Sequence, residues 1–324
     1  MPRMQIRQRD SVQVDHLYVS PNIFGNVWYL DGTNGASGNS GRDPLAAKST
    51  IAQVVSVSAA GDTVVVAPGT YTVDVGTAAM LPTANQYWRA AQLPAPGAAP
   101  TVIFTQDADD NVAPIVSVDV NGVIFEGIEF KLVAGGTTAL YLIDAAQTTA
   151  VRGLSFENCW FNLNGVDAAV KALKLDDATN AVVGMTLRNC RFVGGSGTTS
   201  QVDYIQVGVG GLESSLAEHN IFELESADAD CYGFHFADPG ATAKSYGCVI
   251  RNNDFIGPVD AGEDGVGVFF AAAMTETEIV SLIRTNYFAY CSATPVTIDE
   301  MNKGVVNNYV GDNDTGGTLV DPGT

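Results

Sequence analysis

Carboxylate side chains gather at several points of this 324-residue chain, and paired carboxylates are the groups that hydrolyse most glycosidic bonds. Two members of the densest group could stand at the separation that a general acid and a general base need. The chain has 36 Asp and Glu against 16 Lys and Arg, so such groups are also typical of solvated acidic loops, the interpretation we favour. The densest group is Glu223, Glu225, Asp228 and Asp230, and a second is Asp260, Glu263 and Asp264.

Two other segments carry oxygen ligands of the kind that calcium prefers. One is Asp31, Gly32, Thr33 and Asn34, and the other is Gly311, Asp312, Asn313 and Asp314. Neither segment completes an EF-hand loop, and both have the composition of turns. We therefore expect no metal and no cofactor, and we assign no metal-binding or cofactor-binding residue.

A short sequence phrase occurs seven times, about thirty residues apart. The structure that this repeat forms must hold the acidic groups in place. The closing residue is Phe six times and then Val310, and successive closers are 31, 31, 30, 33, 33 and 22 residues apart. A fixed period of this size indicates stacked units, none of which buries its apolar face alone. The copies are VIFEGIEF (123–130), LSFENCWF (154–161), MTLRNCRF (185–192), SLAEHNIF (215–222), CVIRNNDF (248–255), SLIRTNYF (281–288) and GVVNNYV (304–310).

Within each phrase an apolar residue precedes a charged one, which is typical of a strand with one buried face. Asparagine dominates the next two columns, and Asn tolerates left-handed backbone geometry. We predict a parallel β-helix whose Asn columns form an inward amide ladder and whose closing Phe residues stack inside, with roughly 4.8 Å between rungs. His219 stands in an Asn column, where we expect a hydrogen-bonded structural role. The outward column Glu157, Arg188, Glu218 and Arg251 alternates in charge and predicts a ladder of ion pairs.

The start of the repeat region reads WYLDG (28–32), then a Gly/Asn/Ser loop, TIAQ (50–53) and GDTVVVAPGTY (61–71). In this pattern residues 27–71 resemble the start of the pectate-lyase-like right-handed β-helix superfamily. In such proteins a helix closes the N-terminal end of the coil, which would otherwise expose unpaired amides. The resemblance predicts strands at 27–30 and 63–67 and a cap helix at about 44–59, with Leu45, Ile51, Val54 and Val55 on one side. The matching residues are Trp28, Tyr29, Asp31, Gly32, Thr50, Ile51, Gly61, Asp62, Thr63, Val64, Val66, Pro68, Gly69, Thr70 and Tyr71.

The predicted fold is therefore all-β: a single right-handed parallel β-helix of about nine rungs over residues 27–324, with an extended N-terminal arm at 1–26. The superfamily includes lyases, hydrolases, epimerases and virion proteins, so the fold does not select an activity. Of the polygalacturonase-like motifs NTD, DD, GHG and RIK, only DD occurs, at 109–110 and 176–177. The lyase pattern of calcium-binding Asp facing a basic residue is not recognisable. Because His16, His219 and His235 are scattered, we assign no catalytic residue.

The combination of a rod and a short arm resembles phage β-helix proteins. We expect a non-enzymatic virion structural protein, that is a head-decorating, spike or fibre protein, made in the host cytoplasm. The arm at 1–26, which holds Arg3, Arg7 and Arg9, would bind capsid or tail proteins. Outward apolar residues favour lateral assembly, with a homotrimer as the expected state. These residues are Trp160, Ile221, Tyr287 and Tyr309.

Two alternatives remain open: a polysaccharide-cleaving, tailspike-type lyase or hydrolase, and a carbohydrate-binding adhesin. A host surface glycan is a possible partner for each. A net charge of −20 argues against binding nucleic acid or an anionic membrane. The longest apolar run, 266–274, is too short to span a bilayer. Five Cys cannot all pair within the chain, and Cys159 and Cys190 share an inward column, so we expect buried thiols there.

Overall fold

The computed structural model describes most of the repeat region and part of each connecting loop. The arm expected at 1–26 lies outside it except for Gly25 and Asn26. The described residues are 25–73, 80–95, 97–106, 114–132, 140–145, 148–163, 170–175, 180–194, 201–208, 210–224, 231–236, 245–257, 265–270, 279–289, 291, 296–297, 305–306 and 309–310.

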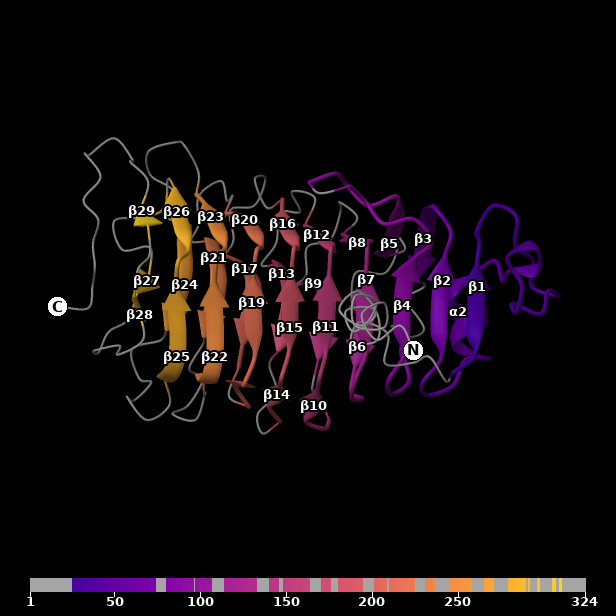
Figure 1. Cartoon of the computed structure of the whole chain (residues 1–324), viewed down its shortest axis with the longest axis horizontal. Coiled ribbons are helices and arrows are strands. Elements are labelled where there is room, and N and C mark those ends of the chain that lie inside the picture. Colours follow the sequence, from indigo (N-terminus) through magenta and orange to yellow (C-terminus); the bar gives the residue numbers. More distant parts are fainter. Residues whose placement is uncertain are drawn as a thin grey trace, which may run out of the picture.

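The chain forms an all-β, right-handed parallel β-solenoid, built from three sheets that we call A, B and C (Figure 1). After the first turns of the coil, each turn adds one or two strands to sheet A, then one to sheet B and one to sheet C, and neighbouring strands pair in parallel. The earliest strands, in indigo, lie at one end of the coil, and the latest, in yellow, lie at the other (Figure 1). A parallel β-helix was predicted from the repeat, and it is confirmed.

Sheet A has thirteen described strands. They are β1 (Val27–Leu30), β2 (Thr63–Val66), β4 (Tyr87–Ala90), β7 (Ile124–Glu126), β10 (Val151–Arg152), β11 (Ser155–Glu157), β14 (Val182–Val183), β15 (Thr186–Arg188), β18 (Leu212–Glu213), β19 (Leu216–Glu218), β22 (Ser245–Arg251), β25 (Ile279–Arg284) and β28 (Val305–Val306).

Sheets B and C follow the same order along the coil. The strands of sheet B are β3 (Gly69–Val73), β5 (Val102–Gln106), β8 (Ile128–Lys131), β12 (Trp160–Asn162), β16 (Arg191–Val193), β20 (Ile221–Glu223), β23 (Asp254–Ile256), β26 (Tyr287–Ala289) and β29 (Tyr309–Val310). Those of sheet C are β6 (Val116–Val118), β9 (Leu140–Ala145), β13 (Val170–Leu175), β17 (Val202–Val207), β21 (Cys231–Phe236), β24 (Gly265–Phe270) and β27 (Val296–Thr297).

The closing Phe residues form a continuous stack inside the coil, as predicted. Successive ring centroids from Phe161 to Phe288 are 4.6, 4.5, 4.7 and 4.9 Å apart, with the planes within 10° of parallel. Each of these side chains is at most 1% exposed. The in-register pairing of sheet B places one ring directly above the next, so each ring buries both faces.

The two Asn columns have different roles, so the prediction that both point inward as an amide ladder is correct for only one of them. The first column has left-handed backbone throughout, from Asn158 (φ 54°) to Thr285 (φ 53°), and its side chains face solvent. The second column is buried and forms the amide ladder: Asn220 Nδ2 donates to Asn253 Oδ1 (2.9 Å), and Asn253 Nδ2 donates to Asn286 Oδ1 (3.0 Å). The expectation of a hydrogen-bonded His219 inside the ladder was therefore wrong, because His219 (φ 59°) is an exposed turn residue.

The predicted helix is shorter than expected. Helix α2 covers Ile51–Val55, and a 3-10 turn, η1, covers Pro44–Ala46. Ile51 and Val54 are buried as predicted, whereas Leu45 is 95% exposed because it lies outside the helix. Thr50 caps the N-terminus by accepting from the Gln53 N–H. The Ser56 hydroxyl donates to the Gln53 carbonyl, a local bond that competes with helix continuation. Among the described residues, no helix is long and apolar enough to cross a membrane.

The Asp62 side chain, which precedes β2, forms hydrogen bonds to residues around β1 and to the segment after α2. Its carboxylate accepts from the Asn26 N–H (2.7 Å), the Trp28 Nε1–H (2.7 Å) and the Ala59 N–H (2.8 Å). Burial alone would raise the pKa of Asp62, but these hydrogen bonds and the charge of Arg42 lower it below its ordinary value. The Asp62 carboxylate therefore holds the segments at 26–28 and 59–62 together.

The charged column of sheet A contains the predicted ion pairs. Glu218 accepts from Arg188 (2.7 Å) on one neighbouring rung and from Arg251 (2.6 Å) on the other. Burial acts to raise the pKa of Glu218, but the two guanidinium groups outweigh it and lower that pKa. Cys159 and Cys190 are buried as predicted, and burial raises the pKa of the Cys190 thiol. Both arrangements support the register of the rungs.

Phe192→Ala should destabilise the coil by about 3–5 kcal/mol, because it leaves a cavity between the Phe161 and Phe222 rings. Equilibrium urea unfolding measures this free energy. Leu45→Ala is the matched control, since Leu45 is 95% exposed and its loss should change stability by less than about 0.5 kcal/mol. Equal effects of the two substitutions would contradict the proposed stack.

Asp62→Asn should cost about 1–3 kcal/mol at neutral pH, because the substitution removes a buried charged acceptor. The folded pKa of Asp62 is lowered, so its stabilisation is present above the unfolded value of about 3.9 and is lost as pH falls through the folded value. Urea unfolding of both proteins from pH 7 to pH 3 should show the difference shrinking below about pH 4. A difference in unfolding free energy that stays constant over this range would contradict a stabilising role of the ionised Asp62 carboxylate.

Candidate functional site

The outer face of sheet C gathers charged side chains from distant parts of the sequence. In β13, Val170, Ala172, Leu173 and Leu175 are buried while Lys171 and Lys174 are partly exposed. The parallel register extends both outward positions along the coil. One column is Tyr141, Lys171, Asp203 and Tyr232, and the other is Asp144, Lys174, Gln206, His235 and Phe269.

His235 and Asp203 form a hydrogen-bonded pair on this face. His235 Nδ1 lies 2.8 Å from Asp203 Oδ1, and Gln201 Nε2 donates to the same oxygen at 2.9 Å. His235 Nδ1 also lies 3.1 Å from Gln201 Nε2. A carboxylate only accepts, so in the tautomer that donates to Asp203 the proton is on Nδ1 and the lone pair is on Nε2. No described residue hydrogen-bonds to Nε2. The pair therefore has the arrangement of a base held by an orienting carboxylate.

The surroundings of the pair restrict its motion. The His235 ring stacks on Tyr232 with centroids 4.5 Å apart and meets Phe269 edge-on at 5.1 Å. The side chain of Asp203 is 3% exposed and that of His235 is 13% exposed. A partly buried imidazole fixed by two rings and a carboxylate is preorganised for proton transfer at Nε2.

A cationic group lies on the same face. Lys174 Nζ is 3.7 Å from Asp144 Oδ2 and 4.9 Å from the centroid of the Tyr141 ring. Lys174 and His235 share a column and are separated by one rung, which carries Gln206, so they are roughly 9.6 Å apart along the coil. A base and a cation at this spacing can hold an anionic group and remove a proton near it.

The acidic groups that the sequence singled out do not form this site. Glu223 is paired with Arg191 on sheet B, where Arg191 Nε donates to Glu223 Oε1 at 3.0 Å. Asp31 accepts from the Asn34 side chain and from the backbone N–H groups of Thr33 and Asn34, as in an ordinary turn. Those hydrogen bonds lower the pKa of Asp31. Glu225, Asp228, Asp230, Asp260, Glu263, Asp264, Asp312, Asn313, Asp314 and the DD pairs at 109–110 and 176–177 lie outside the described residues.

Within the described ranges, no group of three or more His, Cys, Asp and Glu side chains could hold a metal ion. The sequence interpretation also missed His235 and Asp203, because it compared only the seven phrases. The signal was present in the next strand of each rung, where β13, β17 and β21 carry polar residues at positions two and five. Extending the repeat by one strand would have aligned Lys174, Gln206 and His235.

No family model matches the chain, and no curated protein matches it. Among solved structures, a rhamnogalacturonan lyase is similar at 15% identity and a TM-score of 0.47, covering 88% of this chain and 73% of that chain. A pectin methylesterase from Aspergillus niger is similar at 12% identity and a TM-score of 0.49, and the match covers 90% of this chain and 88% of that chain. A PL6 family alginate lyase is similar at 14% identity and a TM-score of 0.45, and the match covers 89% of this chain and 37% of that chain. Such values carry no argument about activity, and the fold rests on the strand registers above.

Proposed function

We propose that this solenoid cleaves an acidic polysaccharide, with His235 as the general base and Asp203 as the residue that positions it. The observation that carries the proposal is the 2.8 Å hydrogen bond between Nδ1 and Oδ1 on the outer face of sheet C. Lys171 and Lys174, two of only 16 basic residues in the chain, lie on the same face. They suit a substrate that carries carboxylate groups.

The chemistry follows from this arrangement. Lys174 pairs with the carboxylate of a uronic acid unit and makes the proton on the adjacent carbon more acidic. The Nε2 lone pair of His235 takes that proton, and Asp203 stabilises the imidazolium through Nδ1. The electron pair of the broken C–H bond forms a C=C bond, and the glycosidic C–O bond on the next carbon breaks. The leaving oxygen takes a proton from water, and His235 returns its proton to solvent.

The length of the coil suits a polymeric substrate. We propose a coil of nine rungs that α2 closes at its N-terminal end, which gives a length of roughly 40 Å at ~4.8 Å per rung. Sheet C presents its outward columns along this axis, in register from β9 to β24. A linear chain of sugars can therefore contact several rungs at once, which adds binding energy away from the reacting unit.

The virion role expected from the sequence stays a prediction, as do docking through residues 1–26 and the homotrimer. The described residues bear on none of these three expectations. A spike that cleaves a host surface glycan would combine the virion location with the activity proposed here. An adhesin, the other alternative, would bind the same polymer without cleaving it.

His235→Ala should lower the rate of polysaccharide cleavage by about 10²–10⁴-fold, because it removes the base. Activity on polygalacturonate and alginate is measured by the ultraviolet absorbance of the unsaturated product. Asp203→Asn should lower the rate less and should change its pH profile, since it keeps the imidazole and removes the charge of its partner. Arg152→Ala, an exposed change on sheet A, is the control. Full activity in His235→Ala, or polymer binding without any cleavage by the wild-type protein, would overturn the proposal.

A further inference from the structure

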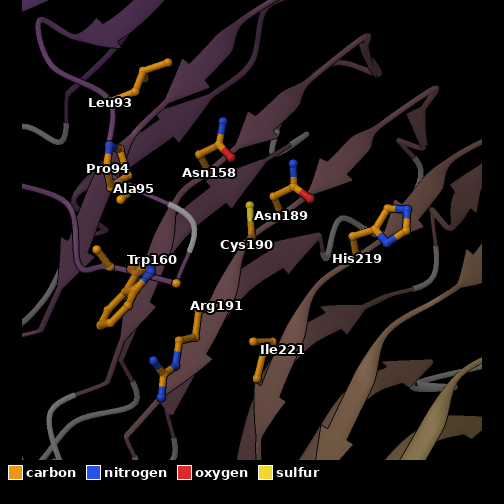
Figure 2. A pocket seen from close by; sticks show the side chains of 12 residues that line it. Leu93, Pro94, Ala95, Asn158, Trp160, Asn189, Cys190, Arg191, His219 and Ile221 are labelled. Carbon is orange, nitrogen blue, oxygen red and sulfur yellow. The ribbon is translucent and has the colours of Figure 1, made fainter.

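A groove of about 330 Å³ crosses sheet B, away from the charged columns of sheet C. One wall is the segment that follows β4, with Leu93 and Pro94 facing the groove (Figure 2). The floor comes from three successive rungs of the coil. The volume falls in the range of ~300–1,000 Å³ that is typical of small-ligand sites.

Two parallel rows of side chains form the floor (Figure 2). The first row is Asn158, Asn189 and His219, whose left-handed backbone (φ 54°, 53° and 59°) directs each side chain out of the coil. The second row is Trp160, Arg191 and Ile221, which are paired in register on β12, β16 and β20. Each row therefore repeats once per rung, at roughly 4.8 Å.

The chemistry of the floor favours an uncharged, hydroxyl-rich ligand. Amides both donate and accept hydrogen bonds, which matches hydroxyl groups. Arg191 is the one cation among the described lining residues, and its Nε and a terminal nitrogen both donate to Glu223 Oε1. That pair is closer than the 3.7 Å contact of Lys174 with Asp144, so an anionic ligand would gain less here than on sheet C. Trp160, with the Arg191 guanidinium 4.8 Å from its ring, and Leu93, 39% exposed, add apolar surface. A sugar ring combines an apolar C–H face with hydroxyl groups around its rim, so it satisfies both rows.

Other occupants fit less well. A peptide that adds to a sheet needs an unpaired edge, but β12, β16 and β20 are paired on both sides. A wholly apolar ligand would bury the amides of Asn158 and Asn189 without partners, which is costly. Nucleic acid is disfavoured by the net charge of −20.

We propose that this groove binds a neutral segment of a glycan chain that runs along the coil axis, one sugar unit per rung. The length of one sugar unit in an extended chain is close to the rise per rung. The site is separate from the His235–Asp203 pair and does not rest on the proposed cleavage, since the two lie on different sheets.

The test measures binding of neutral oligosaccharides to the full-length protein by titration calorimetry. The probes are malto-, cello-, xylo- and chito-oligosaccharides, each from the disaccharide to the hexasaccharide, and hexagalacturonate is the acidic comparison. We expect at least one neutral series to bind, with affinity rising up to about three sugar units, because three rungs line the floor. Trp160→Ala should weaken binding at least tenfold. Asn189→Gly, which removes the amide but keeps the left-handed turn, should weaken it severalfold.

Tyr287→Ala is the matched control, since Tyr287 occupies the Trp160 column on a later rung, is 44% exposed and lies outside the groove. It should bind as the wild type does. Binding of no neutral oligosaccharide, or binding unchanged by both Trp160→Ala and Asn189→Gly, would overturn the inference. Binding confined to hexagalacturonate and abolished by His235→Ala would also overturn it, while supporting the cleavage site on sheet C. Loss of neutral binding in Trp160→Ala with cleavage intact would confirm two sites.

Discussion

From Gly127 to Thr285, one residue per rung turns the chain from sheet A into sheet B, and it does so with a positive φ. The rest of the structure depends on this single-residue turn. It sends the next side chain inward, where Cys159, Cys190 and the Asn220–Asn253–Asn286 ladder lie buried. It also sets the register of the following strand, so that each closing Phe lies over the previous one. Left-handed geometry costs most residues roughly 1–2 kcal/mol, which is why Gly and Asn dominate this column.

The same constraint produces the two functional surfaces. Because every rung repeats in phase, an outward position on one strand becomes a column along the coil. On sheet C such columns bring Asp203 and His235 together from strands 32 residues apart. On sheet B and the adjoining turns they place Asn158, Asn189 and Trp160 on one floor. A solenoid of this kind offers a linear polymer one outward side chain of each column at each step of its length.

The fold could be predicted from the sequence because the Phe and Asn columns recur in an easily recognised phrase. The buried Phe stack, the left-handed turns and the Glu218 ion pairs were visible in that phrase. Strand β1 was predicted separately, from the segment 27–71. The two Asn columns could not be told apart, since amide side chains suit both a left-handed turn and a buried ladder. His219 was misplaced for this reason. The helix was predicted too long, because the pattern of apolar residues does not reveal the Ser56 hydrogen bond that competes with it.

The site was harder to predict, because polar residues of sheet C follow loops of different length. The acidic clusters are visible in the sequence because their residues are neighbours in the chain. The His235–Asp203 pair forms only through the register between β17 and β21. The most direct test is a crystal structure of the full-length protein with bound oligogalacturonate. We expect sugar units along sheet C, with a carboxylate at Lys174 and a ring carbon within reach of His235 Nε2. A ligand bound elsewhere, with the outer face of sheet C unoccupied, would contradict it.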